Sequence, residues 1–199
     1  MKSNFIGIVV LAAGASVRMG KAKQLLEFQE KTLLRRSAET ALQISDKVVV
    51  TLGARSETLR AEIEDLPVAI AENKDWKQGM GGSLKIGLQK LLENDANLRG
   101  VITTVCDQPF VDAELLGKLA ARYDATNCLI AACEYANTLG VPALFSAELF
   151  SELLALAPGH GAKHLIEKHL NRVVAVPFPE GAFDIDTPAD YENLIENFT

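Results

Sequence analysis

The chain has 199 residues, of which 48% are hydrophobic and 23% charged, with a formal net charge of −6 and a pI near 5.2. This length and apolar content are sufficient for one domain with a sizeable core, and disorder is not expected. The acidic balance argues against general nucleic-acid binding, which needs a basic face. No apolar run approaches the roughly 20 residues that cross a bilayer, so we expect no membrane association.

The cysteines Cys106, Cys128 and Cys133 are odd in number and lack the spacing of a zinc site. They predict reduced, mostly buried thiols in a cytoplasmic protein. The apolar N-terminal segment, residues 1–11, could be mistaken for a short signal peptide. It continues into a glycine-rich loop and lacks a cleavage region, so we expect a buried strand over residues 5–11.

Strand-like and helix-like segments alternate along the chain, judged by apolar runs and by apolar residues at helical spacing. In chain order we expect a strand at 5–11, a helix at 31–42, a strand at 47–52, a helix at 57–64, a strand at 67–71, a helix at 83–92, a strand at 100–105, a helix at 112–123, strands at 128–133 and 141–145, helices at 147–156 and 161–169, a strand at 172–176 and a final helix.

This alternation predicts an α/β fold, a single-domain three-layer α/β/α sandwich over residues 1–199 with a Rossmann-like, mainly parallel sheet. Ligands of such sheets bind at the carboxyl ends of the strands. Three segments should meet there: the loop after Leu11, the loop after Val105 and the turn at 184–187. Just beyond that turn, Thr187 should cap the final helix, with Pro188 at its first position and Asp190 as capping-box partner.

The loop LAAGASVRMG, residues 11–20, has the composition of an anion-binding loop. Gly14 and Gly20 frame it, and the small residues between let a ligand approach backbone N–H groups closely. Arg18 offers a planar fork of donors suited to phosphate oxygens, and Lys23 adds a point charge. The alternative is a plain surface turn with solvated basic residues. Its position directly after the first strand favours phosphate binding.

A second glycine-rich segment, residues 73–88, runs from a loop into a helix. Its glycines, Gly82 among them, leave the backbone free to approach a planar group. Ser83 lies near the expected helix start, where its hydroxyl could bind a ligand or serve as an N-cap. Trp76 could equally be a packing residue.

Acidic residues follow two of the predicted buried segments. Asp107 comes directly after the strand at 100–105, where an unpaired carboxylate would be costly unless it binds a metal. Asp184 and Asp186 alternate along an extended segment and therefore face the same side. Carboxylates together with substrate phosphates are the usual ligands of Mg²⁺. A turn or capping role is the alternative for Asp107 and Asp186.

The segment LAAGASVRMGKAKQLL, residues 11–26, resembles the signature of nucleotidyltransferases that act on the molybdenum cofactor, and most of all the cytidylyltransferases. The resemblance extends over the whole chain. It implies a sheet of the nucleotidyltransferase type, magnesium at Asp107 and at Asp184 or Asp186, and catalysis by Arg18, Lys23 and Asp107. The nucleotide-binding residues that it implies are Leu11, Ala12, Ala13, Gly14, Arg18, Lys23, Gly82 and Ser83.

Two later segments resemble the acceptor side of the same family. Gly140 and Pro142 would shape one wall. The turn at 159–163 departs from the family pattern, in which an acidic residue replaces His160 and an arginine often replaces Lys163. His160 and His164 lie four residues apart, but without a third ligand at a fitting position we do not expect a zinc site.

The resemblance implies transfer of CMP from CTP to the phosphate of molybdopterin or molybdenum cofactor, with Mg²⁺, and release of pyrophosphate. Ala13 stands where guanylyltransferases more often carry a second glycine, which favours CTP over GTP. The enzymatic alternatives are guanylyl transfer and transfer to a sugar or alcohol phosphate. The alternative of another class is a non-catalytic protein that binds the cofactor and inserts it into a molybdenum hydroxylase.

Overall fold

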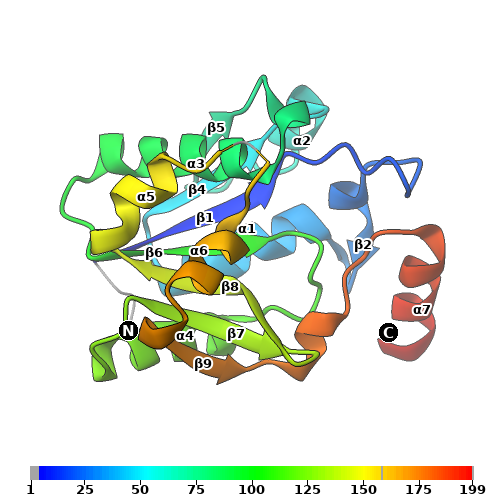
Figure 1. Cartoon of the computed structure of the whole chain (residues 1–199). Coiled ribbons are helices and arrows are strands. Elements are labelled where there is room, and N and C mark those ends of the chain that lie inside the picture. Colours follow the sequence, from blue (N-terminus) through cyan, green and yellow to red (C-terminus); the bar gives the residue numbers. More distant parts are fainter. Residues whose placement is uncertain (1–4, 158, 199) are drawn as a thin grey trace.

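A seven-stranded sheet forms the centre of the molecule (Figure 1). The computed structural model describes residues 5–157 and 159–198. The strand order is β5-β4-β1-β6-β8-β7-β9, and every neighbouring pair is parallel except those that include β8. The strands of this sheet are β1 (Ile6–Ala12), β4 (Val48–Leu52), β5 (Ala69–Glu72), β6 (Gly100–Val105), β7 (Ile130–Tyr135), β8 (Thr138–Ser146) and β9 (Val173–Pro177).

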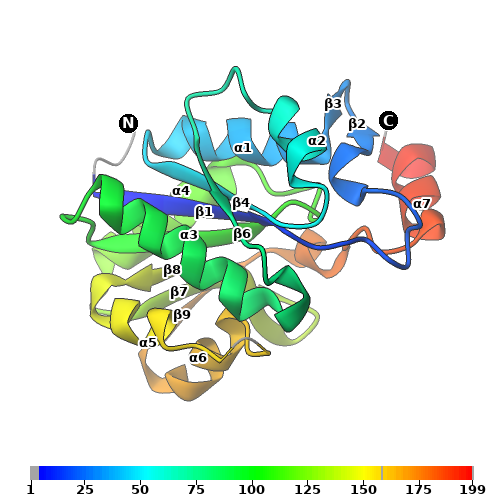
Figure 2. The same cartoon turned by 90° about the horizontal axis from the view of Figure 1, so that it is seen from above.

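Helices cover both faces of the sheet, so the predicted three-layer architecture is confirmed (Figure 2). On one face lie α1 (Leu33–Ile44) and α4 (Ala113–Ala125), with α2 (Ser56–Ala61) packed on β4. On the other lie α3 (Met80–Asn94), α5 (Phe150–Leu154) and α6 (Ala162–Lys168). Short 3₁₀ turns complete the order at η1 (Lys23–Leu25), η2 (Trp76–Gln78), η3 (Ala147–Leu149), η4 (Leu170–Arg172) and η5 (Pro179–Ala182).

The central strand β1 is buried along its whole length because helices pack on both of its faces. On one side, α3 comes so close that a Cβ at Gly87 would lie 2.6 Å from Cγ1 of Val9. The register pairs Leu11 with Val105 of β6 and Ala12 with Leu52 of β4. The carboxyl ends of these three strands therefore meet at one edge of the sheet.

A small hairpin that we did not predict precedes α1. It consists of β2 (Glu27–Phe28) and β3 (Lys31–Thr32), so α1 begins at Leu33 instead of residue 31. Thr32 caps α1 by accepting a hydrogen bond from the Arg35 backbone N–H at 3.2 Å. The two turn residues, Gln29 and Glu30, have φ angles of 51° and 64°. Neither is a glycine or asparagine, so the sequence carries no ordinary hairpin signal there.

The final helix, α7 (Pro188–Phe198), lies beside β2 at the edge of the molecule (Figure 1). A separate hydrophobic cluster fixes it there, formed by Met19, Leu26, Phe28, Leu33, Ile185 and Leu194. The predicted capping box is confirmed. The Asp190 carboxylate accepts hydrogen bonds from the Thr187 backbone N–H at 2.7 Å and hydroxyl at 2.9 Å, and the Thr187 hydroxyl accepts one from the Asp190 N–H at 3.3 Å.

The expected strand at 5–11 is β1, and residues 1–4 of the apolar N-terminal segment lie outside the described residues. Cys106 and Cys133 are buried as predicted, whereas Cys128 is half-buried. Among the described helices, none has the length and apolar character needed to cross a membrane.

Candidate functional site

A cleft of about 380 Å³ opens where β1 and β6 end. Its walls come from the loop after β1, the segment around η2 and the start of α3, and the end of β6. Of the predicted residues, this lining includes Leu11, Ala12, Ala13, Gly14, Lys23, Ser83 and Asp107. The lining does not include Gly82, Arg18, Asp184 or Asp186, and the last three lie beside the cleft as described below.

The loop after β1 turns sharply at Ser16, whose φ of 55° lies in the left-handed region. The backbone N–H groups of Met19 and Gly20 both donate to the Ser16 carbonyl, at 3.1 and 3.2 Å. The Ser16 hydroxyl accepts a hydrogen bond from the Lys23 N–H at 3.1 Å. The turn therefore brings Lys23 back to the end of β1.

Gln24 is a component of this loop that the sequence did not indicate. Its side chain is buried, with 1% exposed. Its amide nitrogen donates to the carbonyls of Ala12 at 3.0 Å and Gly14 at 2.7 Å, and its amide oxygen accepts from the Ser16 hydroxyl at 3.1 Å. Glutamine is ordinarily a surface residue, so its residue type gives no warning of this role.

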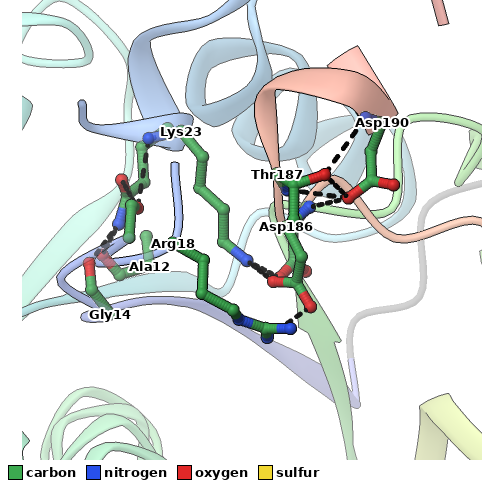
Figure 3. A network of polar contacts seen from close by, with 10 residues as sticks. Ala12, Gly14, Arg18, Lys23, Asp186, Thr187 and Asp190 are labelled. Carbon is green, nitrogen blue, oxygen red and sulfur yellow. Dashed lines mark hydrogen bonds and ion pairs between the residues drawn. The ribbon is translucent and has the colours of Figure 1, made fainter. Parts of the chain in front are cut away.

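Two cations, Arg18 and Lys23, join the first part of the chain to Asp186 near its far end (Figure 3). The Lys23 ammonium contacts Asp107 at 2.5 Å and Asp186 at 2.8 Å. The Arg18 guanidinium contacts the other oxygen of Asp186 at 2.6 Å. Lys23 is largely buried, whereas 71% of the Arg18 side chain is exposed. The Lys23 pair is thus the better shielded from solvent.

Protonation in this cluster follows from the same contacts. Burial lowers the pKa of Lys23, but the charges of Asp107 and Asp186 outweigh it and raise the value to about 12. The hydrogen bond from Lys23 holds the pKa of Asp186 below its usual range. Partial burial of the carboxyl group and the nearby Asp107 raise the pKa of Asp184 to about 6. Lys23 and Asp186 are therefore charged at neutral pH, and a cation nearby would favour ionised Asp184.

The segment with Asp184 and Asp186 is held by its middle residue. Ile185 is fully buried and its backbone N–H donates to the Asp107 carbonyl at 2.9 Å. Its two acidic neighbours are both more exposed than Ile185, as the alternation predicted. Asp190 accepts a hydrogen bond from the Asp186 N–H at 3.1 Å, so the helix cap also fixes this segment.

The carboxylates fit a magnesium ion by the chemistry of their donors. Asp107 and Asp186 already converge on one positive group, the Lys23 ammonium, so they can face a common cation. Within residues 5–157 and 159–198, no three His, Cys, Asp or Glu side chains form a ready-made metal cluster. Magnesium usually takes one or two protein carboxylates, with water and substrate phosphates completing its shell.

The segment around α3 differs in detail from the prediction. The helix begins at Met80, so Gly82 and Ser83 lie inside its first turns and Gly79, with φ of 120°, is the N-cap. Ser83 is therefore not the cap. Its hydroxyl accepts a hydrogen bond from the buried Asn73 amide at 2.9 Å, and it lines the cleft. A Cβ at Gly82 would have only an ordinary contact, so no close approach there requires glycine.

Gly53, at the end of β4, is a second residue that the sequence did not indicate. A Cβ there would lie 2.7 Å from both the Ala13 carbonyl oxygen and Cβ of Trp76. The Ala54 N–H also donates to the Ala13 carbonyl at 3.1 Å. Trp76 therefore both packs on the end of β4 and lines the cleft.

The expected acceptor side lies at β7 and β8. A Cβ at Gly140 would collide with the Tyr135 hydroxyl, which donates to the Val141 carbonyl at 3.0 Å. His160 and His164 are exposed and stack with ring centroids 4.5 Å apart. A Cβ at Gly161, between them, would lie 3.7 Å from the sulfur of Met80, which lines the cleft.

A family model, curated proteins and solved structures all match this chain. The model of the MobA-like NTP transferase domain matches residues 8–173. Molybdenum cofactor cytidylyltransferase of Escherichia coli (strain K12) is 25% identical over 196 residues, which are 98% of this chain and 97% of that protein. Nicotine blue oxidoreductase of Paenarthrobacter nicotinovorans is 34% identical over 118 residues, 58% of this chain and 55% of that protein, so the match spans about half of that relative.

Among solved structures, Rv0371c from Mycobacterium tuberculosis H37Rv has a TM-score of 0.77 at 32% identity, covering 98% of this chain and 100% of that one. A complex of the same protein with manganese has a TM-score of 0.73 at 29% identity, with the same coverage.

Proposed function

Since this chain belongs to the MobA-like NTP transferase family and is a nucleotidyltransferase, we propose that it transfers CMP from CTP to the phosphate of molybdopterin or molybdenum cofactor. The reaction would use Mg²⁺ and release pyrophosphate. The observation that carries the proposal is the cluster of Arg18 and Lys23 with Asp107 and Asp186, directly beside the loop after β1. It combines cations for a triphosphate with carboxylates for a metal.

In this reaction an oxygen of the acceptor phosphate attacks the α-phosphorus of the triphosphate. A new P–O bond forms, the bond between the α-phosphorus and the bridging oxygen breaks, and pyrophosphate leaves with the electron pair. An ionised phosphate is already nucleophilic, so no protein base is required. Catalysis then depends on positioning and on neutralising the charge of the leaving group.

Each proposed residue has a distinct role. Lys23, whose raised pKa keeps it charged, and Arg18 would bind the triphosphate oxygens and stabilise departing pyrophosphate. Residues 11–14 would contact the nucleotide, and Gly82 and Ser83 would border its ribose or base. Asp107 and Asp186 would hold magnesium, with Asp184 beside them. The metal would supply charge neutralisation at the phosphates when bound.

The choice of CTP has two supports. The E. coli relative that aligns with almost the whole chain is a cytidylyltransferase. Ala13 lines the cleft, at the position where guanylyltransferases more often carry a second glycine.

The test is pyrophosphate release from CTP, GTP, ATP and UTP in the presence of Mg²⁺ and molybdopterin acceptors. We expect CTP to be used fastest, and faster use of GTP would replace cytidylyl by guanylyl transfer. Asp107→Ala should lose turnover, whereas Asp124→Asn, which removes an exposed charge paired with Arg99, should retain it. The proposal is wrong if no triphosphate turns over with any phosphorylated acceptor. Tight binding of the product dinucleotide without turnover would instead indicate a cofactor-carrying protein.

A further inference from the structure

The carbonyl groups of the loop after β1 are all held by protein donors. Gln24 donates to the carbonyls of Ala12 and Gly14, and the Ala54 N–H donates to the carbonyl of Ala13. Three successive carbonyl oxygens are thereby engaged by protein donors. An anion in the cleft would otherwise meet these oxygens as repelling dipoles.

Holding a carbonyl also fixes the N–H group of the next residue. In a trans peptide unit the C=O and the following N–H point in opposite directions, and these peptide bonds are trans. The N–H groups of Ala13, Gly14 and Ala15 therefore point away from the donors that hold the carbonyls. All three residues line the cleft. In the part of the chain that the structure describes, these N–H groups donate to no protein acceptor.

We infer that Gln24 is a positioning residue whose buried amide orients the loop backbone, so that the N–H groups of Ala13, Gly14 and Ala15 form a cradle for the triphosphate. Successive N–H groups of this kind make an anion-binding concavity. Ser16 completes the arrangement, because its hydroxyl donates to Gln24 and accepts from the Lys23 N–H. The hydrogen bonds of Gln24 and Ser16 thus hold both the backbone of the cradle and the start of the turn that carries Lys23.

This inference rests on the proposed function, because it takes the bound anion to be the triphosphate. It assigns the positioning of that anion to a neutral residue, which borders the cleft and whose amide is engaged by the loop. Gln24 is buried and makes all three of its hydrogen bonds to the loop, which distinguishes this role from general packing.

The first test compares Gln24→Met, which keeps the approximate volume without charge or hydrogen bonds, with Gln43→Met, an exposed glutamine of α1. Calorimetry measures Mg²⁺-dependent binding of CTP, CMP and inorganic tripolyphosphate. We expect Gln24→Met to weaken CTP and tripolyphosphate binding about tenfold or more, and CMP binding by less than about threefold. The control should bind like wild type.

Loss that grows with the number of phosphates supports the inference, because general destabilisation would weaken CMP and CTP equally. Equal losses for both ligands, or no loss, would overturn it. Wild-type protein that binds neither CTP, GTP nor tripolyphosphate would overturn the proposed function as well. Wild type that binds them while Gln24→Met binds equally would overturn the inference alone.

The second test does not require the variant to fold. In NMR titrations of wild type with inorganic tripolyphosphate, the backbone amide signals of Ala13, Gly14 and Ala15 should shift. Unchanged amide signals at saturation would contradict the cradle. Should Gln24→Met fail to fold, Ser16→Ala removes only the hydroxyl beside Gln24, and a smaller loss with the same dependence on phosphate number is expected.

Discussion

Lys23 contacts both carboxylates that we propose for the metal. Its ammonium forms ion pairs with Asp107 and Asp186, and Arg18 supplies the second positive charge through its contact with Asp186. Under the proposed function, binding of metal and triphosphate would require an exchange of partners, in which the carboxylates take the metal and Lys23 takes the phosphates. Lys23 would then compete with the metal before the triphosphate binds and assist the triphosphate in the complex.

This double role can be separated experimentally with Lys23→Met. Removing the ammonium leaves the two carboxylates facing each other, so Mn²⁺ affinity measured by EPR should be unchanged or higher than in wild type. The affinity for CTP with Mg²⁺ should fall by about tenfold or more, because a charge-assisted contact to phosphate is lost. Lys118→Met removes an exposed lysine paired with Glu114 and should leave both affinities unchanged. Weaker Mn²⁺ binding in Lys23→Met would contradict the competition.

Among single residues, the sequence indicated the charged residues of the site and missed the residues that position them. Lys23, Asp107 and Asp186 were predicted together because basic and acidic residues follow buried strands. Gln24 and Gly53 were not, because their roles depend on neighbours that folding brings together. Nothing in a lone glycine shows that Trp76 will pack against it.

Among the elements, α7 is fixed by a cap that also reaches the site. Asp190→Ala removes the acceptor for the backbone N–H groups of Asp186 and Thr187. By analogy with N-cap losses, we expect a destabilisation of about 1 kcal/mol at pH 7, measured by urea unfolding. Glu192→Ala, on the same helix, is the matched control and should cost less.

The effect of Asp190→Ala should depend on pH. Burial opposes ionisation of Asp190, but hydrogen bonds from Thr187 and Asp186 outweigh it and hold the pKa of the carboxyl below its usual range. A lowered folded-state pKa contributes stability above the unfolded pKa, and this stability is lost as the pH falls through the folded value. The stability deficit should therefore shrink in acid below about pH 4. A deficit that stays constant from pH 7 to pH 3 would exclude a role for the ionised carboxylate.

Two helical glycines offer a test of packing. A Cβ at Gly87 of α3 would lie 2.6 Å from the Thr51 hydroxyl oxygen, whereas at Gly117 of α4 the nearest contact is 3.8 Å. Gly87→Ala should destabilise the protein by about 1–2 kcal/mol, since overpacking outweighs the gain in helix propensity. Gly117→Ala should stabilise it by about 0.5–1 kcal/mol. Urea unfolding midpoints that shift in opposite directions for the two variants would confirm both predictions. Shifts of the same sign would contradict the packing argument.

The order of strands and helices was largely predictable, but the β2–β3 hairpin and several other features were not. The alternation of patterns located the strands of the large sheet, although β7 begins two residues later than expected. The direction of β8 depends on pairing with β6 and β7, which local sequence does not encode. The start of α3 was missed because glycines ordinarily disfavour helix, whereas Gly81 and Gly82 lie in its first turn.

For the molecule as a whole, we propose that residues 1–199 form one cooperative domain, because one sheet links most of the described elements. Thermal or urea unfolding should then give one transition. Fluorescence of Trp76, the one tryptophan of the sequence, and far-ultraviolet circular dichroism should report the same midpoint. Separate midpoints would indicate that the region around the cleft or α7 unfolds independently.

The ion pairs from Arg18 and Lys23 to Asp186 span 168 and 163 positions of the sequence. During translation, the ribosome makes the loop long before it makes this aspartate, and N-terminal segments begin to fold first. A nascent chain that already contains β1 and β6 therefore carries a loop with one anchor missing. Nucleotide binding should be acquired only after Asp186 has been made, so nascent chains that still lack it would not compete with the folded enzyme for substrate.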